Sequence, residues 1–286
     1  MPDQAGRKWR GDDKAMKSAG KVLSVLSLYT AGRNVWSPER AARQLDVSLA
    51  TSYRYFNTLV ACGMLERLQR NRYVLGPAIV ELDKQVRAAD PVLAIARPIM
   101  VRLLKRVRQP ATVLLCRYFR EQVMCIHEES NRPDEPVSSY ERGARRPLFR
   151  GSTSKVILAY LPPRALSDLW QSHRREIVAA GLGGSYEEFK SALQVIRKDG
   201  VRVSAGEVDP GRIGISAPLF DAHSRIIGSL SIVLMSPRAS DAAISRLCTS
   251  VMNAAREIER MRDSRGGRNG ARKKAISEKA RVKTSA

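Results

Sequence analysis

The sequence lacks the patterns that mark membrane, redox and metal proteins. No apolar run approaches the roughly 18 residues that a membrane-spanning helix needs, and no signal peptide opens the chain. The three histidines lack ligand spacing, and the four cysteines include no Cys-x-x-Cys pair. Because each cysteine lies in an apolar run, we expect buried free thiols in a cytoplasmic protein, without a metal or cofactor. These cysteines are Cys62, Cys116, Cys125 and Cys248.

Patterns of catalysis are missing as well. The segment around Ser216 lacks the Gly-x-Ser-x-Gly nucleophile elbow, and no histidine is placed to act as its base. The segment Arg145–Lys155 lacks the Gly-x-x-x-x-Gly-Lys spacing of a P-loop. We therefore expect no enzyme and name no catalytic residue.

Acidic residues are few relative to basic ones. The chain has 50 Lys and Arg against 28 Asp and Glu, a net charge of +22. The excess is densest in residues 14–90, with 12 basic and 6 acidic groups, and in residues 265–286, with 8 and 1. Such a balance attracts polyanions through electrostatic steering and counterion release. A nucleic acid fits this charge, and an anionic membrane surface is the main alternative.

Turn signals and hydrophobic periodicity divide the 286 residues into two domains. The larger, C-terminal one mixes helices with β-rich segments whose turns favour a mainly antiparallel sheet, an α/β sensory-type domain. The expected fold class is therefore α+β. We expect a disordered tail at 1–13, a small domain at 14–76, a linker helix at 77–90, the second domain at 91–264 and a basic disordered tail at 265–286.

The most specific local pattern lies between Ser37 and Gly76, after a helical stripe that ends near Gly32. Ser37 and Pro38 suit the N-cap and first turn of a helix over 38–45. Residues 46–48 form a turn, a further helix follows over 49–62, and a hairpin over 64–75 has its tip at 69–71. This order predicts a winged helix-turn-helix, which places its 49–62 helix in a DNA major groove.

That helix has a packing face and a polar face. Ser52, Tyr55 and Phe56 share the packing face with Leu59 and Val60. The opposite face offers a small N-terminus, hydroxyls, a guanidinium and an amide, which suits base edges and phosphates. The predicted DNA-contacting residues are Ser48, Ala50, Thr51, Tyr53, Arg54, Asn57, Arg70 and Arg72, with Arg40 and Arg43 flanking the backbone.

Two alternatives to sequence-specific DNA binding stay open. The polar face could be an ordinary solvated face, although the caps, the turn and the wing in register favour DNA. The positive charge would also be expected of a nonspecific nucleic-acid-binding protein. Such a protein would bind all sequences equally, and its affinity would fall steeply with salt. RNA stacking is disfavoured, because Tyr53 is the single exposed ring on this helix.

The second domain has one candidate anion site. Gly151, Ser152 and Thr153 lie where a helix begins, close to several arginines. Free amides at a helix N-terminus, together with hydroxyls, can hold a small carboxylate or phosphate. An ordinary serine cap with Lys155 on the surface is the alternative.

Several short motifs, in this order and at this spacing, resemble one family. They are Ser48–Leu59, Arg72–Gly76, Gly143 with Arg146–Leu148, Ser154–Ala159, Gly200–Ser204 with Glu207, and Ser216–Asp221. The chain thereby resembles the isocitrate-lyase-regulator (IclR) family of bacterial transcription factors over residues 16–261. The family usually has an aliphatic residue where Ser52 stands, and Gly-Lys where Ser154-Lys155 stands.

The resemblance implies a winged helix-turn-helix joined to a GAF-like effector-binding domain. It implies an operator duplex and a small metabolite, commonly an organic or aromatic acid, as partners, and a homodimer of a kind that often assembles into a homotetramer. Effector binding would shift the spacing of paired recognition helices and so change operator affinity. By position, the effector pocket would involve Ser152, Thr153, Ser204, Gly214, Ser231 and Val233.

Overall fold

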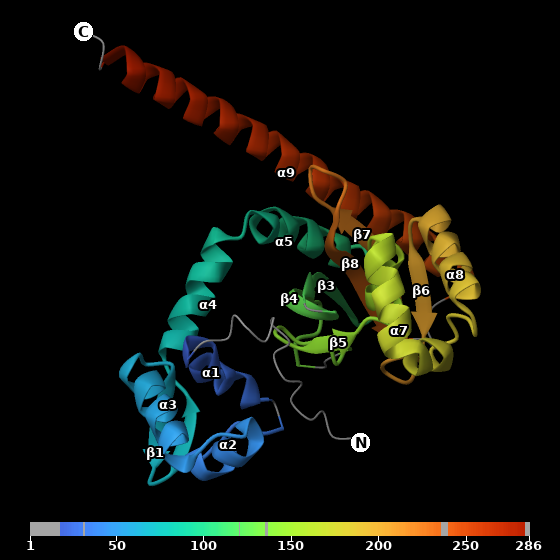
Figure 1. The fold of residues 1–286 in the computed structure, drawn as a ribbon. Helices are drawn as coiled ribbons and strands as arrows, with labels where there is room; N and C mark the ends of the chain where they lie inside the picture. Colours follow the sequence, from blue (N-terminus) through green and yellow to red (C-terminus); the bar gives the residue numbers. More distant parts are fainter. Residues whose placement is uncertain (1–17, 31, 120, 135–136, 236–239, 284–286) are drawn as a thin grey trace. The chain divides into compact units, whose positions relative to one another are not determined.

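The structure is a computed structural model that describes residues 18–30, 32–119, 121–134, 137–235 and 240–283, with the backbone alone beyond residue 264. The chain divides between Asp90 and Pro91 into two units. Figure 1 labels the helices and strands of each unit. The expected disordered segment at 1–13 lies outside the described residues.

The N-terminal unit joins short helices to a two-stranded wing. Ser37 caps α2 by accepting the backbone N–H of Arg40 at 3.4 Å, and Pro38 occupies the first turn. Asp46 ends α2 in the left-handed region, with φ of 54°, and Ser48 caps α3. These caps fix the tight turn between the two helices. The elements are α1 (Ser18–Ser24), the 3-10 helix η1 (Leu26–Leu28), α2 (Pro38–Leu45), α3 (Leu49–Ala61), β1 (Leu65–Gln69), β2 (Arg72–Leu75) and α4 (Ala78–Ala89).

Aromatic residues connect α3 to the wing through the core of this unit. The ring of Phe56 meets that of Tyr73 edge-on, with centroids 4.9 Å apart. Trp36 and Tyr73 exchange backbone hydrogen bonds of 3.0 and 2.9 Å, which adds the segment before α2 to the edge of the wing. The indole Nε1 of Trp36 donates to the carbonyl of Leu28 at 3.0 Å. The wing and α3 therefore share one rigid core.

The wing ends at a position that only glycine tolerates. A Cβ at Gly76 would collide with the carbonyl oxygen of Gly63. The same carbonyl accepts the N–H of Ala78 at 3.1 Å, and Gly76 itself donates to Met64 at 2.8 Å. This close approach turns the chain from the wing into α4.

The C-terminal unit is a six-stranded sheet with helices on both faces. Its strands run in the order β5-β4-β3-β8-β7-β6, and every neighbouring pair is antiparallel. The fold class expected from the sequence is therefore confirmed. The elements are α5 (Pro91–Leu104), β3 (Ala111–Phe119), β4 (Gln122–Ser130), β5 (Arg145–Pro147), α6 (Ser152–Ala159), α7 (Pro163–Ala179), α8 (Tyr186–Asp199), β6 (Arg202–Ala205), β7 (Arg212–Phe220), β8 (Ile226–Met235) and α9 (Asp241–Lys283).

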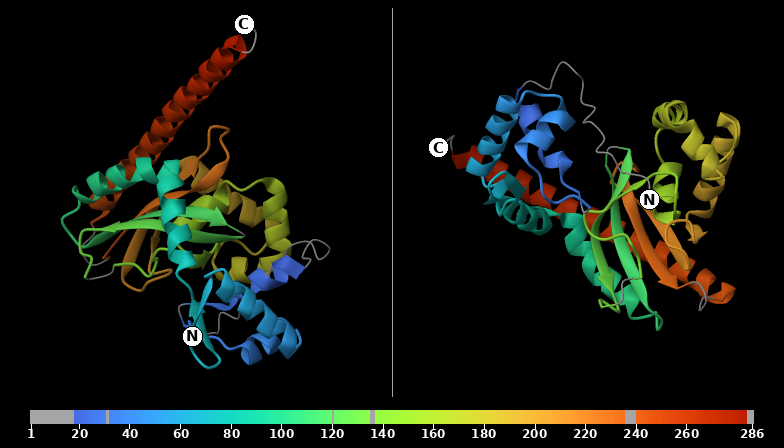
Figure 2. Two further views of the ribbon diagram at one scale, coloured as in Figure 1. Left: turned by 90° about the vertical axis from the view of Figure 1, so that its left-hand side faces the viewer. Right: turned by 90° about the horizontal axis from the view of Figure 1, so that it is seen from below.

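Side chains alternate between two cores, one on each face of the sheet. Val113 and Leu115 of β3 pack with α5 and α9, whereas Leu114 and Cys116 pack with α6, α7 and α8. Figure 2 shows these two helical layers on opposite faces of the sheet. Because both faces are covered, β3, β7 and β8 are apolar along most of their length.

Some elements differ from the expectation. The helical stripe ending near Gly32 is shorter, formed by α1 and η1, and residues 14–17 lie outside the described residues. β5 was not foreseen, because three residues carry too little periodicity. The helix expected over 163–173 is longer, because α7 continues past His173, whose φ of −130° marks a kink. The helix α9 continues to Lys283, where a disordered tail was expected, and its last part is rich in the good helix formers Ala, Lys and Arg.

The cysteines differ from the expectation as well. Cys116 and Cys125 are buried, but Cys248 is half-buried and Cys62 is exposed. Cys62 follows the last turn of α3, beyond its buried residue Leu59. The apolar run around it therefore continues past the end of the packed face.

Candidate functional site

The polar face of α3 is open, and the opposite face is packed. Tyr55, Phe56 and Leu59 are buried in the core of the N-terminal unit, as predicted from their spacing. Val60, assigned to the same face, is exposed because it lies at the rim of the helix. The predicted DNA-contacting positions on α3 and the wing are exposed or half-buried: Ser48, Ala50, Thr51, Tyr53, Arg54, Asn57, Arg70 and Arg72.

The N-terminus of α3 is held in place by its own hydroxyls. The Oγ of Ser48 accepts the N–H of Thr51 at 3.2 Å and donates to the Oγ1 of Thr51 at 2.8 Å. The hydroxyl hydrogen of Thr51 remains to donate to a phosphate or a base edge. Arg54 has no carboxylate partner among the described residues, so its five N–H donors face solvent.

Ser52 attaches α3 to α2. Its side chain is fully buried, and its Oγ donates to the carbonyl of Pro38 at 2.8 Å. This carbonyl belongs to the first turn of α2, so the bond fixes how the two helices cross. An aliphatic side chain at this position would make only apolar contacts, whereas the hydroxyl of Ser52 makes one directional hydrogen bond.

Tyr53 is engaged within the protein. Its hydroxyl donates to Oε1 of Glu39 at 2.6 Å, and Nδ2 of Asn71 donates to the same oxygen at 3.0 Å. The hydrogen bond from Tyr53 lowers the pKa of the Glu39 carboxyl below its usual range. Asn71, at the wing tip, has a left-handed φ of 59°. Glu39 thus joins α2, α3 and the wing tip, a connection that sequence reasoning missed.

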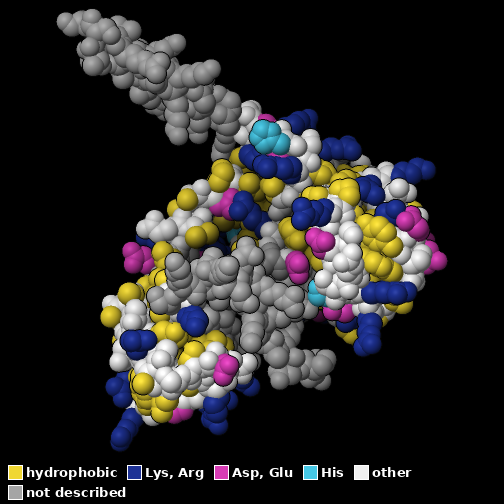
Figure 3. All heavy atoms as spheres, in the orientation of Figure 1, with side chains coloured by type: hydrophobic (Ala, Val, Ile, Leu, Met, Phe, Trp, Pro, Cys, Tyr) yellow, Lys and Arg dark blue, Asp and Glu magenta, His cyan; other side chains and the backbone are white. Residues whose placement is uncertain are grey.

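Basic side chains surround this unit. Figure 3 shows Lys and Arg side chains at the rim of the N-terminal unit, with few carboxylates between them. Arg70 and Arg72 are exposed on the wing, and the Nη1 of Arg72 lies 3.5 Å from Oε1 of Gln69. Such a surface suits the phosphates on both sides of a groove.

In the C-terminal unit, hydroxyls converge at the start of α6. The Oγ of Ser216 donates to the Oγ of Ser152 at 2.8 Å, and the N–H of Ser152 donates to the Oγ of Ser204 at 2.9 Å. Thr153 donates to Ser231 at 3.1 Å. Because these residues come from α6, β6, β7 and β8, the sheet register brings them together.

A small cavity of about 30 Å³ lies against these hydroxyls. Five of the six predicted effector residues line it, and the sixth, Ser231, lies behind Thr153 through the hydrogen bond above. The five are Ser152, Thr153, Ser204, Gly214 and Val233. Sequence reasoning missed Tyr140, Glu207, Asp209 and Arg212, which also line it. In its present form the cavity is much smaller than a typical ligand pocket, which has about 300 Å³ or more.

Gly214 makes the cavity possible. A Cβ at this position would lie 2.6 Å from the Oγ of Ser152 and 3.4 Å from the Oγ of Ser204. The missing side chain thus lets two hydroxyls approach β7. Any larger residue would displace Ser152 or fill the cavity.

The anion site expected at the start of α6 holds a carboxylate of the protein itself. Oε2 of Glu207 accepts the N–H of Gly151 at 2.9 Å and lies 2.8 Å from Nζ of Lys155. Burial alone would raise the pKa of Glu207, but the hydrogen bonds from Lys155 and Gly151 outweigh it and lower this pKa. Lys155 is buried, with 4% of its side chain exposed, so the alternative of a surface lysine is wrong.

The described residues include neither a metal-binding cluster nor a membrane-spanning helix. They contain no group of three or more His, Cys, Asp or Glu side chains arranged to hold a metal ion. No helix among them is long and apolar enough to cross a membrane.

A helix open to a DNA groove in one unit and a polar cavity in the other are the two halves of a ligand-responsive DNA-binding regulator. Residues 18–69 match the IclR helix-turn-helix domain. Residues 85–260 match the family described as bacterial transcriptional regulator IclR, C-terminal. The chain therefore belongs to the IclR family of DNA-binding transcriptional regulators, which are not enzymes, with an effector-binding C-terminal domain.

Individual relatives are distant but cover most of the chain. The HTH-type transcriptional regulator KipR of Bacillus subtilis is 23% identical over 245 residues, 85% of this chain and 96% of its own length. BhcR of Paracoccus denitrificans is 23% identical over 256 residues, 89% of this chain and 90% of its own.

Solved structures share the fold. An IclR homologue from Microbacterium hydrocarbonoxydans, complexed with 4-hydroxybenzoate, has a TM-score of 0.69 at 20% identity, covering 86% of this chain and 99% of its own. An IclR family regulator from Brucella abortus has a TM-score of 0.70 at 18% identity, covering 90% and 98%.

Proposed function

We propose that this chain is a homodimeric transcriptional regulator in which α3 reads an operator and a small organic acid controls that reading. The observation that carries the proposal is the polar face of α3, which stays open while its opposite face is packed. Thr51, Arg54 and Asn57 present a hydroxyl, a guanidinium and an amide on that face. Arg54 pairs with guanine and Asn57 with adenine, each through two hydrogen bonds.

The effector site is the cavity at the start of α6. Support comes from its hydroxyls, which suit a carboxylate, and from Arg212 in its lining. The 4-hydroxybenzoate bound by the Microbacterium homologue favours an acid of this class. Because ligand pockets usually exceed about 300 Å³, the acid binds a widened form of this cavity. Binding therefore selects a different conformation of this unit.

The dimer is supported by α4. This helix buries none of its residues within the described structure, and 73% of Val80 and 62% of Val86 are exposed. Leu82, 48% exposed, adds a third large apolar side chain. An apolar helix surface of this kind suits a partner helix. Pairing of two copies here, with further assembly to a tetramer, would set the distance between the two recognition helices.

Regulation then follows from linkage. An effector that binds one arrangement of the subunits more tightly raises its population, and the spacing of the paired α3 helices changes with it. Operator affinity changes because two half-sites are contacted only at a matching distance.

The experiment that tests the reading helix is Arg54→Ala in the full-length protein. Wild-type protein should protect one palindromic site in footprinting, and loss of a bidentate pair should cost about 1–3 kcal/mol of discrimination at that base. Lys198→Ala, which removes an exposed cation of α8 in the C-terminal unit, is the matched control and should leave the footprint intact.

Three outcomes separate the alternatives. Unchanged footprinting by Arg54→Ala would refute the assigned role of α3. Equal wild-type affinity for all sequences would favour the charge-driven nonspecific protein instead. A panel of small aliphatic and aromatic acids, added to the footprinting reaction, should include one that changes wild-type protection, and no response from any of them would contradict the effector class.

A further inference from the structure

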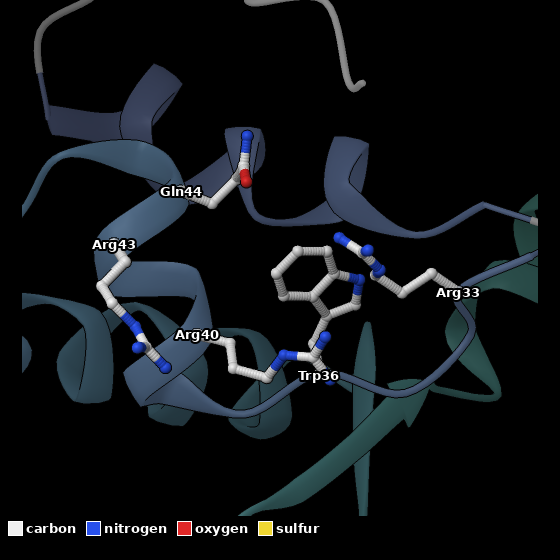
Figure 4. A pocket seen from close by; sticks show the side chains of 5 residues that line it. All are labelled: Arg33, Trp36, Arg40, Arg43 and Gln44. Atoms are coloured by element: carbon white, nitrogen blue, oxygen red, sulfur yellow. The ribbon is translucent and has the colours of Figure 1, made fainter. Parts of the chain in front are cut away.

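A hollow on the surface of the N-terminal unit is rich in arginine. Three guanidiniums, one indole and one amide line it, and its volume is about 240 Å³. Figure 4 shows the side chains around the hollow: Arg33, Trp36, Arg40, Arg43 and Gln44.

Two of the guanidiniums lie over the indole ring. The Cζ atoms of Arg33 and Arg40 are 5.3 and 5.7 Å from the ring centroid of Trp36. The indole is fixed, because only 4% of Trp36 is exposed and its Nε1 donates to the carbonyl of Leu28. Contact with an aromatic face restrains a guanidinium and leaves its in-plane N–H donors free.

The positive charge of the hollow is only partly balanced within the described structure, through the electrostatic interaction of the Glu39 carboxylate with Arg43. No carboxylate among the described residues forms an ion pair with Arg33, Arg40 or Arg43. Glu39, the acidic residue of the first turn of α2, directs its Oε1 to Tyr53 and Asn71 instead. Three like charges around one hollow repel each other, and an anion between them removes that repulsion.

We propose that this hollow binds a phosphate group. Planar guanidiniums bind phosphate oxygens through paired N–H donors, and the amide of Gln44 adds a further donor. Most of its lining is exposed, so the hollow is open to a large partner as well as to a free ion.

A backbone phosphate of bound DNA is the source that the position favours, and this part rests on the proposed function. Arg43 follows Glu39 by one helical turn, on the same side of α2. Because Glu39 is hydrogen-bonded to Tyr53 of α3, this side of α2 faces the reading helix. A phosphate held here would fix the register of α3 in the groove without reading sequence.

The test measures salt dependence on a short duplex of random sequence, so that it needs no operator. Arg33→Gln and Arg40→Gln should each weaken binding and make the slope of log affinity against log salt shallower by about 1. Arg33→Lys keeps the charge and should keep the slope, which separates loss of a phosphate contact from misfolding. Lys198→Gln, at an exposed position of α8, is the control, and its slope should equal that of the wild type.

A second arm identifies the source of the phosphate. Inorganic phosphate is titrated without DNA, and the melting temperature is followed in wild type and in Arg40→Gln. Shallower slopes with no saturable response to inorganic phosphate assign the hollow to the DNA backbone. Unchanged slopes with a saturable response that Arg40→Gln abolishes assign it to free phosphate.

Unchanged slopes without such a response would overturn the proposal. If the wild type gave no operator footprint, the proposed function would be overturned instead. The salt slopes on random-sequence DNA would still test whether the hollow binds a phosphate.

Discussion

Neighbouring residues on α3 have different tasks. Ser52 points inward and binds Pro38, whereas Tyr53 points sideways and binds Glu39. Arg54 is the next residue in the chain. None of the described residues pairs with it, so its side chain is available to a partner molecule. Because the first two fix the helix on α2 and the wing, fewer groups need to be ordered when DNA binds. Three consecutive residues thus have three different roles. Ser52 packs α3 against α2, Tyr53 holds the helix in position, and Arg54 is available to contact DNA.

The buried hydroxyl of Ser52 should contribute to the stability of the N-terminal unit. Ser52→Ala leaves the carbonyl of Pro38 without its donor, which should cost about 1–3 kcal/mol. Hydrogen exchange of the full-length protein should show faster exchange confined to α2, α3 and the wing. The control is Thr58→Ala, which removes an exposed hydroxyl of the same helix and should change stability by less than about 0.5 kcal/mol.

Unchanged hydrogen exchange in Ser52→Ala would contradict this prediction. If Ser52→Ala left protection of α3 unchanged, the alanine methyl would compensate by packing. The crossing of α2 and α3 would then depend on apolar contact.

At the scale of elements, the start of α6 combines a helix terminus with residues from the sheet. Glu207, in the loop between β6 and β7, reaches the amide of Gly151 and the ammonium of Lys155. A carboxylate at a helix N-terminus is stabilised by the free N–H groups and by the helix dipole. The loop is thereby fixed beside the cavity, so the widening proposed for effector binding would involve this loop.

The pair formed by Glu207 and Lys155 should be important for folding of the C-terminal unit. Glu207→Gln leaves the buried ammonium of Lys155 without its counter-charge, which should cost about 3 kcal/mol. Urea unfolding of the full-length protein gives the change. Glu187→Gln removes half of an exposed pair with Lys190 on α8 and should cost less than about 0.5 kcal/mol.

The ion pair between Glu207 and Lys155 also predicts how the stability of the protein depends on pH. The pKa of Glu207 is lowered in the folded protein, so its contribution is fully present above the unfolded value of about 4.3. It is lost as pH falls through the lower folded pKa, because the unfolded chain then binds more protons. The stability of the wild type should therefore fall more steeply below about pH 4 than that of Glu207→Gln. Parallel curves would contradict the ion pair.

At the scale of the whole chain, the positive charge is unevenly distributed. Residues 265–286 carry eight basic groups and one acidic group, more concentrated than in either domain. We expect this segment to add sequence-independent affinity for DNA through counterion release. A role as a solubilising extension is the alternative.

Deleting residues 265–286 distinguishes the two roles. The deletion should make the salt dependence of binding to a random duplex shallower, while footprinting at the operator keeps its position. A full-length variant with these eight basic residues changed to Gln should behave like the deletion, which controls for the lost length. Equal slopes for all three proteins would leave the segment without a role in DNA binding.

The sequence predicted the elements that carry DNA binding almost to the residue. α2 has the expected bounds, α4 is one residue shorter at each end than the expected 77–90, and α3 differs from expectation at its last residue only. Ser37, Pro38 and Ser48 were sufficient, because caps and turns depend on neighbours in the chain. Five lining residues of the cavity were placed through the family resemblance rather than through periodicity.

What local patterns could not predict are contacts between distant residues. Glu207 meets Gly151 across 56 positions, and Asn71 meets Glu39 across 32. The arginine hollow likewise depends on the backbone bridge between Trp36 and Tyr73, which fixes the indole beneath two guanidiniums.

The sequence by itself thus determined the class of partner, because a capped recognition helix and a basic charge balance can be read from local spacing and composition. Only the tertiary structure decided which polar groups are already occupied and which are free. The physical reason is that hydrogen bonds and ion pairs depend on distances of a few ångströms, which are set when the sheet register and the helix crossings are formed.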